Sequence, residues 1–178
     1  MESGKRFVPD LVAILVENKV IGAKEGQAMV ANFGSQLDVT FDEFVLSTGL
    51  VSKEDLLLAL SQLYEVPAVD VQGYFFDIGL VKSFPKEFLL KYGVIPLEVD
   101  EDLMTVVAFE PDLPGLDRKL EEYGAYVIEF RVGLLQDILD AIRDAYDEEI
   151  VTLDGFTSKD ASELIEEDDL DLLPDESI

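Results

Sequence analysis

The sequence contains no cysteine, no histidine and no tryptophan among its 178 residues. Without cysteine the chain can form no disulfide, no thiolate metal site and no thiol nucleophile. Without histidine it lacks the usual general base, the commonest metal ligand and every triad that depends on an imidazole. We therefore predict that the chain is not an enzyme and holds no metal or cofactor.

Basic residues are scarce, because 13 Lys and Arg face 39 Asp and Glu and the net charge is −26. Such a charge repels phosphate backbones and anionic lipid, so we expect no nucleic-acid or membrane-surface partner, and any protein partner should present a basic face. After Tyr146 the chain carries thirteen acidic residues and one Lys, a net charge of minus twelve. This divides it into a folded body and an acidic tail, 147–178.

Long apolar runs are also missing, and none approaches the length that crosses a bilayer. The start MESGKRF is briefly basic, with no apolar signal core behind it. We expect a cytoplasmic protein. Nearly half of the residues, 48%, are hydrophobic, enough to bury one substantial core or two small ones in contact.

The stretch 40–70 organises the rest of the chain. It predicts a helix that stops at Gly49, a second helix capped by Ser52, and a turn at Pro67 into a strand. Before it, PDLVAILVENKV predicts a helix that begins at Pro9, and AKEGQAMVANF predicts another, weakened by an interior glycine.

The first two helices and the next two form an internal duplication. A shift of thirty residues places apolar residues on apolar residues, in the pairs Leu15 and Val45, Val16 and Leu46, Val20 and Leu50, Ile21 and Val51, Ala28 and Leu58, Val30 and Leu60, and Phe33 and Leu63. We predict two helical units, 1–38 and 39–66, that cover each other's apolar stripes.

Residues 67–146 predict a small sheet with helices. VIPLEV, LMTVVAF and AYVIEFRV have the composition of strands, and DIGLVKSFPKEFLLKYG is two short helical pieces split at Pro85. A helix over GLDRKLEEYG and an amphipathic helix from Leu135 to Tyr146 complete the pattern. The predicted class is α+β: a duplicated helical bundle, a three- to four-stranded sheet packed with helices, and an acidic tail that we expect to be disordered.

The order of several short motifs resembles a known family. These are a helix that ends in Tyr before Val-Pro, the Pro-x-Glu helix start at Pro85, Val-Ile-Pro-Leu, Phe-Glu-Pro, and a closing helix that ends at Tyr146. Together they resemble the MshEN-like N-terminal domain of bacterial type II secretion and type IV pilus assembly ATPases, closely over 40–146 and loosely over 8–38. In that family the domain is a non-catalytic docking and regulatory module before a P-loop motor. GxxxxGK[ST] does not occur in this chain, so the resemblance does not extend to the motor.

Some members of the family bind cyclic di-GMP through a tandem repeat whose units start Arg-Leu-Gly and end in Gln. At the Arg, Gly and Gln positions of the first and then the second unit, this chain carries Asp10, Val12, Phe33, Thr40, Asp42 and Leu63. These residues remove the forked donors and the close backbone approach that a nucleotide needs, and they add negative charge. The resemblance therefore favours a protein-interaction module, with a cyclic di-GMP sensor as the alternative.

Two acidic groups have a plainer explanation than a site. Asp100, Glu101 and Asp102 lack the spacing of a calcium loop, so we expect a solvated hairpin turn. Glu110 and Asp112 flank Pro111, and we expect a loop before a helix rather than an acid and base pair.

The acidic tail also holds clustered apolar residues, which are typical of a segment that folds on a basic, apolar partner groove. The candidates for such partner contacts are Leu164, Ile165, Leu170, Leu172 and Leu173. The alternative is a tail that only improves solubility.

Overall fold

The computed structural model describes residues 3–36 and 38–147, and the surroundings of side chains from Phe7 on. The chain divides into two compact units, Met1–Ala145 and Tyr146–Ile178, and nearly all of the second lies outside the described residues. In the described part, no helix is both long enough and apolar enough to cross a membrane.

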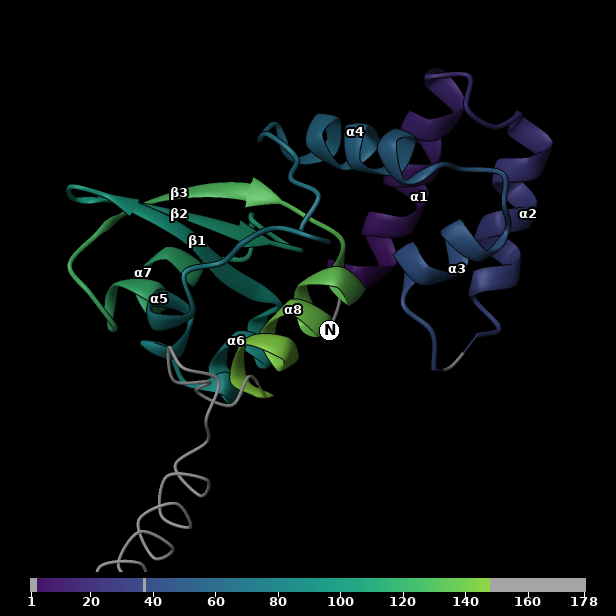
Figure 1. Cartoon of the computed structure of the whole chain (residues 1–178). Helices are drawn as coiled ribbons and strands as arrows, with labels where there is room; N and C mark the ends of the chain where they lie inside the picture. Colours follow the sequence, from purple (N-terminus) through teal and green to yellow (C-terminus); the bar gives the residue numbers. More distant parts are fainter. Residues whose placement is uncertain (1–2, 37, 148–178) are drawn as a thin grey trace, which may run out of the picture. The chain divides into compact units, whose positions relative to one another are not determined.

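The described residues form eight helices and three strands, which confirms the predicted α+β class (Figure 1). In chain order the elements are α1 (Ser3–Glu17), α2 (Ala23–Phe33), α3 (Phe41–Ser47), α4 (Lys53–Tyr64), α5 (Ile78–Lys82), α6 (Lys86–Tyr92), β1 (Val94–Asp100), β2 (Leu103–Ala108), α7 (Leu116–Glu121), β3 (Val127–Val132) and α8 (Leu135–Asp147).

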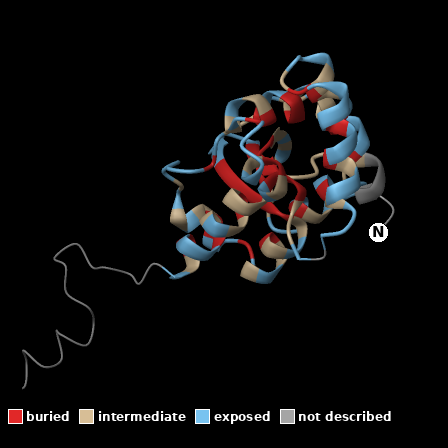
Figure 2. Cartoon of the chain, turned by 90° about the vertical axis from the view of Figure 1, so that its right-hand side faces the viewer, coloured by how far each residue is buried: buried red, intermediate tan, exposed pale blue. Residues whose placement is uncertain are grey.

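Helices α1 to α4 pack together, with α1 against both α2 and α4 and α2 against α3. As predicted, Ser52 caps α4, and its hydroxyl oxygen accepts from the Asp55 N–H at 3.2 Å. The end of α1 is tied to α4 by a bond from Asn18 Nδ2 to Gln62 Oε1, 2.8 Å long. Figure 2 shows the buried residues on the inward sides of these helices and along the sheet.

The expected start of the first helix at Pro9 is wrong, because α1 begins at Ser3 and Pro9 lies inside it. Proline removes one helical hydrogen bond, which destabilises a helix interior. Here the added turns bury Val8 and bring Phe7 against Phe41, Tyr64 and Phe109, with ring centroids 5.4–6.2 Å apart. Burial of these two side chains offsets the missing bond.

The sheet has the order β1-β2-β3, with β2 paired to β1 antiparallel and to β3 parallel. The register of β1 shifts between Pro96 and Glu98, where proline cannot donate to the ladder. Strand β2 is buried over Met104–Ala108, including the polar Thr105. The apolar run from Val106 to Phe109 is typical of a strand covered on both faces, and it is buried up to Ala108. Helices α5 and α6 contact β1, and α7 contacts β3.

The expected strand after Pro67 is reduced to one bridge, between Ala68 and Val132. The Val69 N–H donates to the Val132 carbonyl at 2.9 Å, and the Val132 N–H donates to the Pro67 carbonyl at 3.0 Å. The buried Val132 also belongs to the core of the helical region, so this bridge is where the sheet and helices α1–α4 meet.

Candidate functional site

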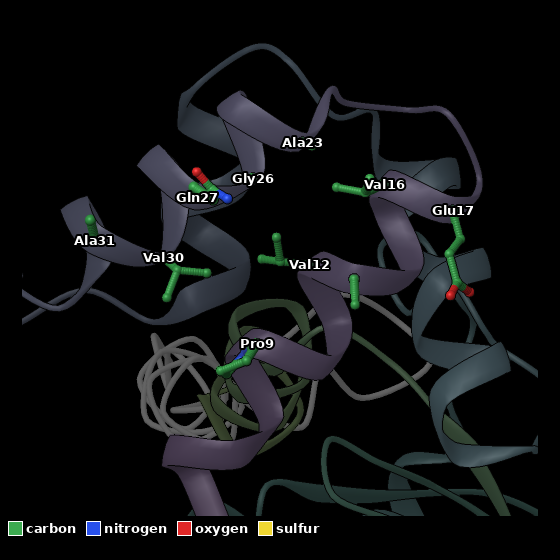
Figure 3. Close-up of a pocket in the computed structure, with 10 residues that line it drawn as sticks. Pro9, Val12, Val16, Glu17, Ala23, Gly26, Gln27, Val30 and Ala31 are labelled. Carbon is green, nitrogen blue, oxygen red and sulfur yellow. The ribbon is translucent and has the colours of Figure 1, made fainter.

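An open groove of about 600 Å³ lies between α1 and α2 (Figure 3). Eight of its ten lining residues are apolar or small, and the other two are a glutamate and a glutamine. The lining is formed by Pro9, Val12, Ala13, Val16, Glu17, Ala23, Gly26, Gln27, Val30 and Ala31. We call this surface the α1–α2 groove.

The floor of the groove is made by a close approach of the two helices at Gly26. A Cβ atom added there would lie 2.9 Å from Val12 Cγ1 and 3.1 Å from Val16 Cγ2. Figure 3 shows both valines pointing from α1 toward α2. The interior glycine that weakens α2 is thus required by packing, since a larger side chain would push the helices apart.

The chemistry of the groove suits a helix better than an anion. Its lining contains no Lys or Arg, and its single charge is the carboxylate of Glu17. The exposed rim is built from small residues, Ala13 on α1 and Ala23 and Ala31 on α2, which allow a third helix to approach closely. From Pro9 to Val16 the groove is about two helical turns long.

Of the first unit's three motif positions, only Asp10 is an exposed polar residue. Val12 is buried in the floor of the α1–α2 groove, with 5% exposure. Phe33 is half-buried, and its ring packs on Phe41 with centroids 5.0 Å apart, beside the start of the second unit.

The second unit's positions are also occupied by packing residues. Thr40 is the N-cap residue of α3, and its buried hydroxyl has no hydrogen-bond partner. Asp42 is only 3% exposed, and its Oδ2 accepts from the backbone N–H of Gln136 at 3.3 Å. Leu63 is half-buried against the helical core. Phe33 packs on Phe41, the residue between Thr40 and Asp42 in the sequence, and none of the six side chains is a cation.

Glu110 and Asp112 lie near the phenol of Tyr64. Burial, and next the charge of Asp112, raise the pKa of Glu110 above its ordinary value. Burial also raises the pKa of Tyr64, with smaller contributions from Asp112 and Glu110, so the phenol stays neutral at physiological pH. Glu110, Asp112 and Tyr64 thus form a partly desolvated acidic cluster between α4 and the loop after β2.

The other acidic candidates also have definite places. Glu101 and Asp102 form the turn between β1 and β2, and Glu101 takes a left-handed φ of 53°. Over residues 3–36 and 38–147 no group of three or more Asp or Glu side chains could hold a metal ion. The tail candidates, Leu164, Ile165, Leu170, Leu172 and Leu173, lie outside the described residues.

The α1–α2 groove was not predicted from the sequence. Leu11 and Leu15 form the buried stripe of α1, whereas Pro9, Ala13 and Val16 lie on another side of the helix and line the groove. The second apolar face of this helix was the sequence signal that could have indicated the groove.

A second feature that the sequence did not reveal lies between α6 and α7. The Nζ atoms of Lys91 and Lys119 lie 5.3 and 5.6 Å from the ring centroid of Tyr92. These three side chains line a mixed cavity of about 400 Å³, together with Glu87 and Glu122. Cations and carboxylates balance there, so the cavity has no clear preference for a charged ligand.

The model of the MshEN domain matches residues 64–152, which are 89 of the 178 residues. The chain belongs to the MshEN domain family. This confirms the resemblance to the N-terminal domains of secretion and pilus assembly ATPases. The α1–α2 groove precedes the segment that the MshEN model matches.

Solved structures are similar to a larger share of the chain than the family model matches. The structure of MshE with cdg has 20% sequence identity and a TM-score of 0.58, and the match covers 76% of this chain and 98% of that one. The N-terminal domain of XpsE has 17% identity and a TM-score of 0.51, with 75% and 92% covered. At these identities the likeness establishes a shared MshEN fold and nothing finer. No curated protein matches the chain.

Proposed function

We propose that this chain is a non-catalytic regulatory module that docks, in the cytoplasm, on a protein of a bacterial secretion or pilus machine. The MshEN family supports this assignment, because its members precede the motors of such machines. The absence of histidine and cysteine removes the commonest catalytic groups. The observation that carries the proposal is the open, apolar α1–α2 groove.

The partner that best fits the groove is an amphipathic helix. Two turns of apolar side chains at positions i, i+3 or i+4, and i+7 would cover Val12, Val16 and Val30. A net charge of −26 favours lysine and arginine on the polar side of that helix, since opposite charges speed the encounter and exclude acidic competitors.

A matched pair of substitutions on α2 tests this docking. Ala31 lines the groove and Ala28 does not, while both are exposed on the same helix. We expect Ala31→Glu to weaken binding at least 10-fold and Ala28→Glu to change it less than 2-fold. Binding is measured with purified cytoplasmic segments of secretion and pilus proteins from the same organism. Equal effects of the two variants would exclude the groove as the docking site.

A cyclic di-GMP sensor is the second candidate, because the chain shares its fold with MshE, whose structure was solved with cdg. The residues at the six motif positions oppose it, since none supplies a cationic donor. Calorimetric titration with cyclic di-GMP, with the MshE domain as positive control, distinguishes the two candidates. We expect only the heat of dilution, and a saturable signal with defined stoichiometry would replace docking with sensing.

A further inference from the structure

Phe75 is the most exposed large apolar side chain in the described residues. Its side chain is 98% exposed, compared with 65% for Val127 and 52% for Leu58. It belongs to the segment 70–77, DVQGYFFD, which we call the aromatic loop. Tyr74 beside it is 38% exposed, so two neighbouring aromatic residues reach solvent.

The aromatic loop is fixed at both ends. At its start Val71 is buried, and Asp70 Oδ1 accepts from the Gln72 N–H at 3.0 Å. At its end Asp77 caps α5, because its Oδ1 accepts from the Leu80 N–H at 3.1 Å. The exposed phenylalanine therefore lies on a short, anchored connection between two fixed points.

The conformation inside the loop directs Phe75 outward. Gly73 takes a left-handed φ of 77°, and the Tyr74 N–H donates to the Val71 carbonyl at 3.2 Å, which closes a tight turn. The rings of Tyr74 and Phe76 pack together, with centroids 4.9 Å apart. Phe76 is thereby partly covered, and Phe75 alone between them is left without a neighbour that buries it.

An aromatic side chain held in this way resembles the anchor residue of a protein interface. Phe75 gains no burial within its own fold, whereas a partner's socket would remove nearly its whole surface from water. Asp70, at the start of the loop, is paired with Lys53, with a distance of 2.9 Å between Oδ1 and Nζ, so the negative charge at the loop comes from Asp77 and from the net charge of −26. This charge favours a protein socket with a basic rim over anionic lipid.

We propose that Phe75, with Tyr74 beside it, is an anchor that enters an apolar socket on a partner protein, and that lysine or arginine side chains rim this socket. The inference rests on the proposed docking function and adds to it a contact outside the α1–α2 groove. Groove and loop would then be two separate contacts of one module.

The partner is found by placing the photoreactive residue p-benzoylphenylalanine at position 75 of the full chain in its native cells. A second chain carries it at Val127, which is also exposed but lies on β3. We expect one protein to be attached at position 75 and not at 127. The same adducts at both positions, or lipid adducts alone, would overturn the proposal.

The identified protein is then purified and titrated with the full chain. We expect Phe75→Ser to weaken binding about 10- to 100-fold, which corresponds to loss of a buried aromatic side chain. Phe75→Leu should restore most of the affinity, and Val127→Ser should leave it unchanged. Binding by Phe75→Ser within 2-fold of the wild type would overturn the anchor.

Ala31→Glu, measured with the same partner, separates the two proposals. If it weakens binding and Phe75→Ser does not, the groove docks and the anchor is wrong. If only Phe75→Ser weakens binding, the anchor stands without the groove. The chain is also mixed with vesicles of three parts phosphatidylcholine to one part phosphatidylglycerol. Vesicle binding that is lost in Phe75→Ser would assign the loop to membranes and overturn the protein socket.

Discussion

Asp42 accepts a hydrogen bond from the backbone N–H of Gln136, 94 positions away in the sequence, with an Oδ2 to N distance of 3.3 Å. Gln136 lies in the first turn of α8, whose free N–H groups need acceptors. The buried carboxylate of Asp42, which belongs to α3, thus caps a different helix, α8. At a position where the cyclic di-GMP motif has glycine, this chain carries a residue that joins α3 to α8.

Replacing Asp42 tests this cap. We expect Asp42→Ala to lower the free energy of unfolding by about 1–2 kcal/mol, because the Gln136 N–H loses its acceptor. Asp42→Asn keeps an oxygen acceptor and should cost less. Urea unfolding followed by circular dichroism measures both. Glu43→Ala, an exposed neighbour on α3, is the control and should stay within about 0.5 kcal/mol of the wild type. Equal losses at both positions would contradict the cap.

Lys53 joins α4 to α8 by ion pairs. Its Nζ lies 2.7 Å from Asp137 Oδ2 and 2.9 Å from Asp70 Oδ1. We expect Lys53→Met to lower the free energy of unfolding by about 1 kcal/mol, since the pairs are partly exposed and partly screened. The exposed Lys24→Met serves as control in the same urea titration, and an equal effect there would show that the pairs contribute nothing.

The contribution of Lys53 also depends on pH in a definite direction. Burial lowers its pKa, but the hydrogen bonds and charges of Asp137 and Asp70 outweigh burial and raise it above the ordinary value of 10.5. A group whose pKa is higher in the folded chain than in the unfolded chain contributes its full stabilisation at pH values below the unfolded pKa. That contribution is lost as the pH rises through the folded pKa. The difference between wild type and Lys53→Met should therefore be constant from pH 7 to 9 and shrink above 10.5.

Gly26 should resist the usual stabilising substitution. Alanine is favoured over glycine in a helix by about 1 kcal/mol, but here its Cβ would overlap Val12 and Val16. We expect Gly26→Ala to lower the melting temperature. Gly34→Ala is the control, because a Cβ there meets nothing closer than 3.5 Å and the φ is −59°. Gly34→Ala should leave the melting temperature unchanged or raise it, and a rise with Gly26→Ala would exclude close packing at the groove floor.

Glu110 should destabilise the fold slightly when ionised. Burial and the nearby Asp112 raise its pKa, so the folded chain holds this proton to a higher pH than the unfolded chain. Stability linked to this group is complete below the unfolded pKa and falls as pH rises through the folded one. We expect Glu110→Gln to be more stable than the wild type at pH 7, by less than about 1 kcal/mol after screening is considered. Near pH 4 the two should coincide, and a constant difference across this range would show that ionisation of Glu110 has no part in it.

Local signals in the sequence predicted much of the fold. Ser52 marked the start of α4, and Pro85 marked the break between α5 and α6. The strands at 94–100, 103–108 and 127–132 were predicted because their runs of apolar and β-branched residues are bounded by turns. These elements depend on residues close together in sequence.

The features that the sequence did not reveal depend on distant contacts. The start of α1 was misplaced because Phe7 is covered by residues as far away as Phe109. The role of Asp42 depends on an N–H 94 positions later. The α1–α2 groove follows from the close approach at Gly26, which the sequence presents only as a weak position in a helix. Helix and strand propensities and hydrophobic periodicity report on neighbouring residues, so they do not predict contacts between residues far apart in the sequence.

The bridge at Val132 has a consequence for how the body of the protein melts. Its backbone bonds to Pro67 and Val69, and its buried side chain belongs to the core of the helical units while its strand belongs to the sheet. The helical bundle and the sheet are therefore coupled through this residue. We expect a single calorimetric transition for residues 1–145 rather than two, with equal calorimetric and van't Hoff enthalpies. A fragment that ends before residue 67 would then contain the four helices but would not unfold cooperatively on its own.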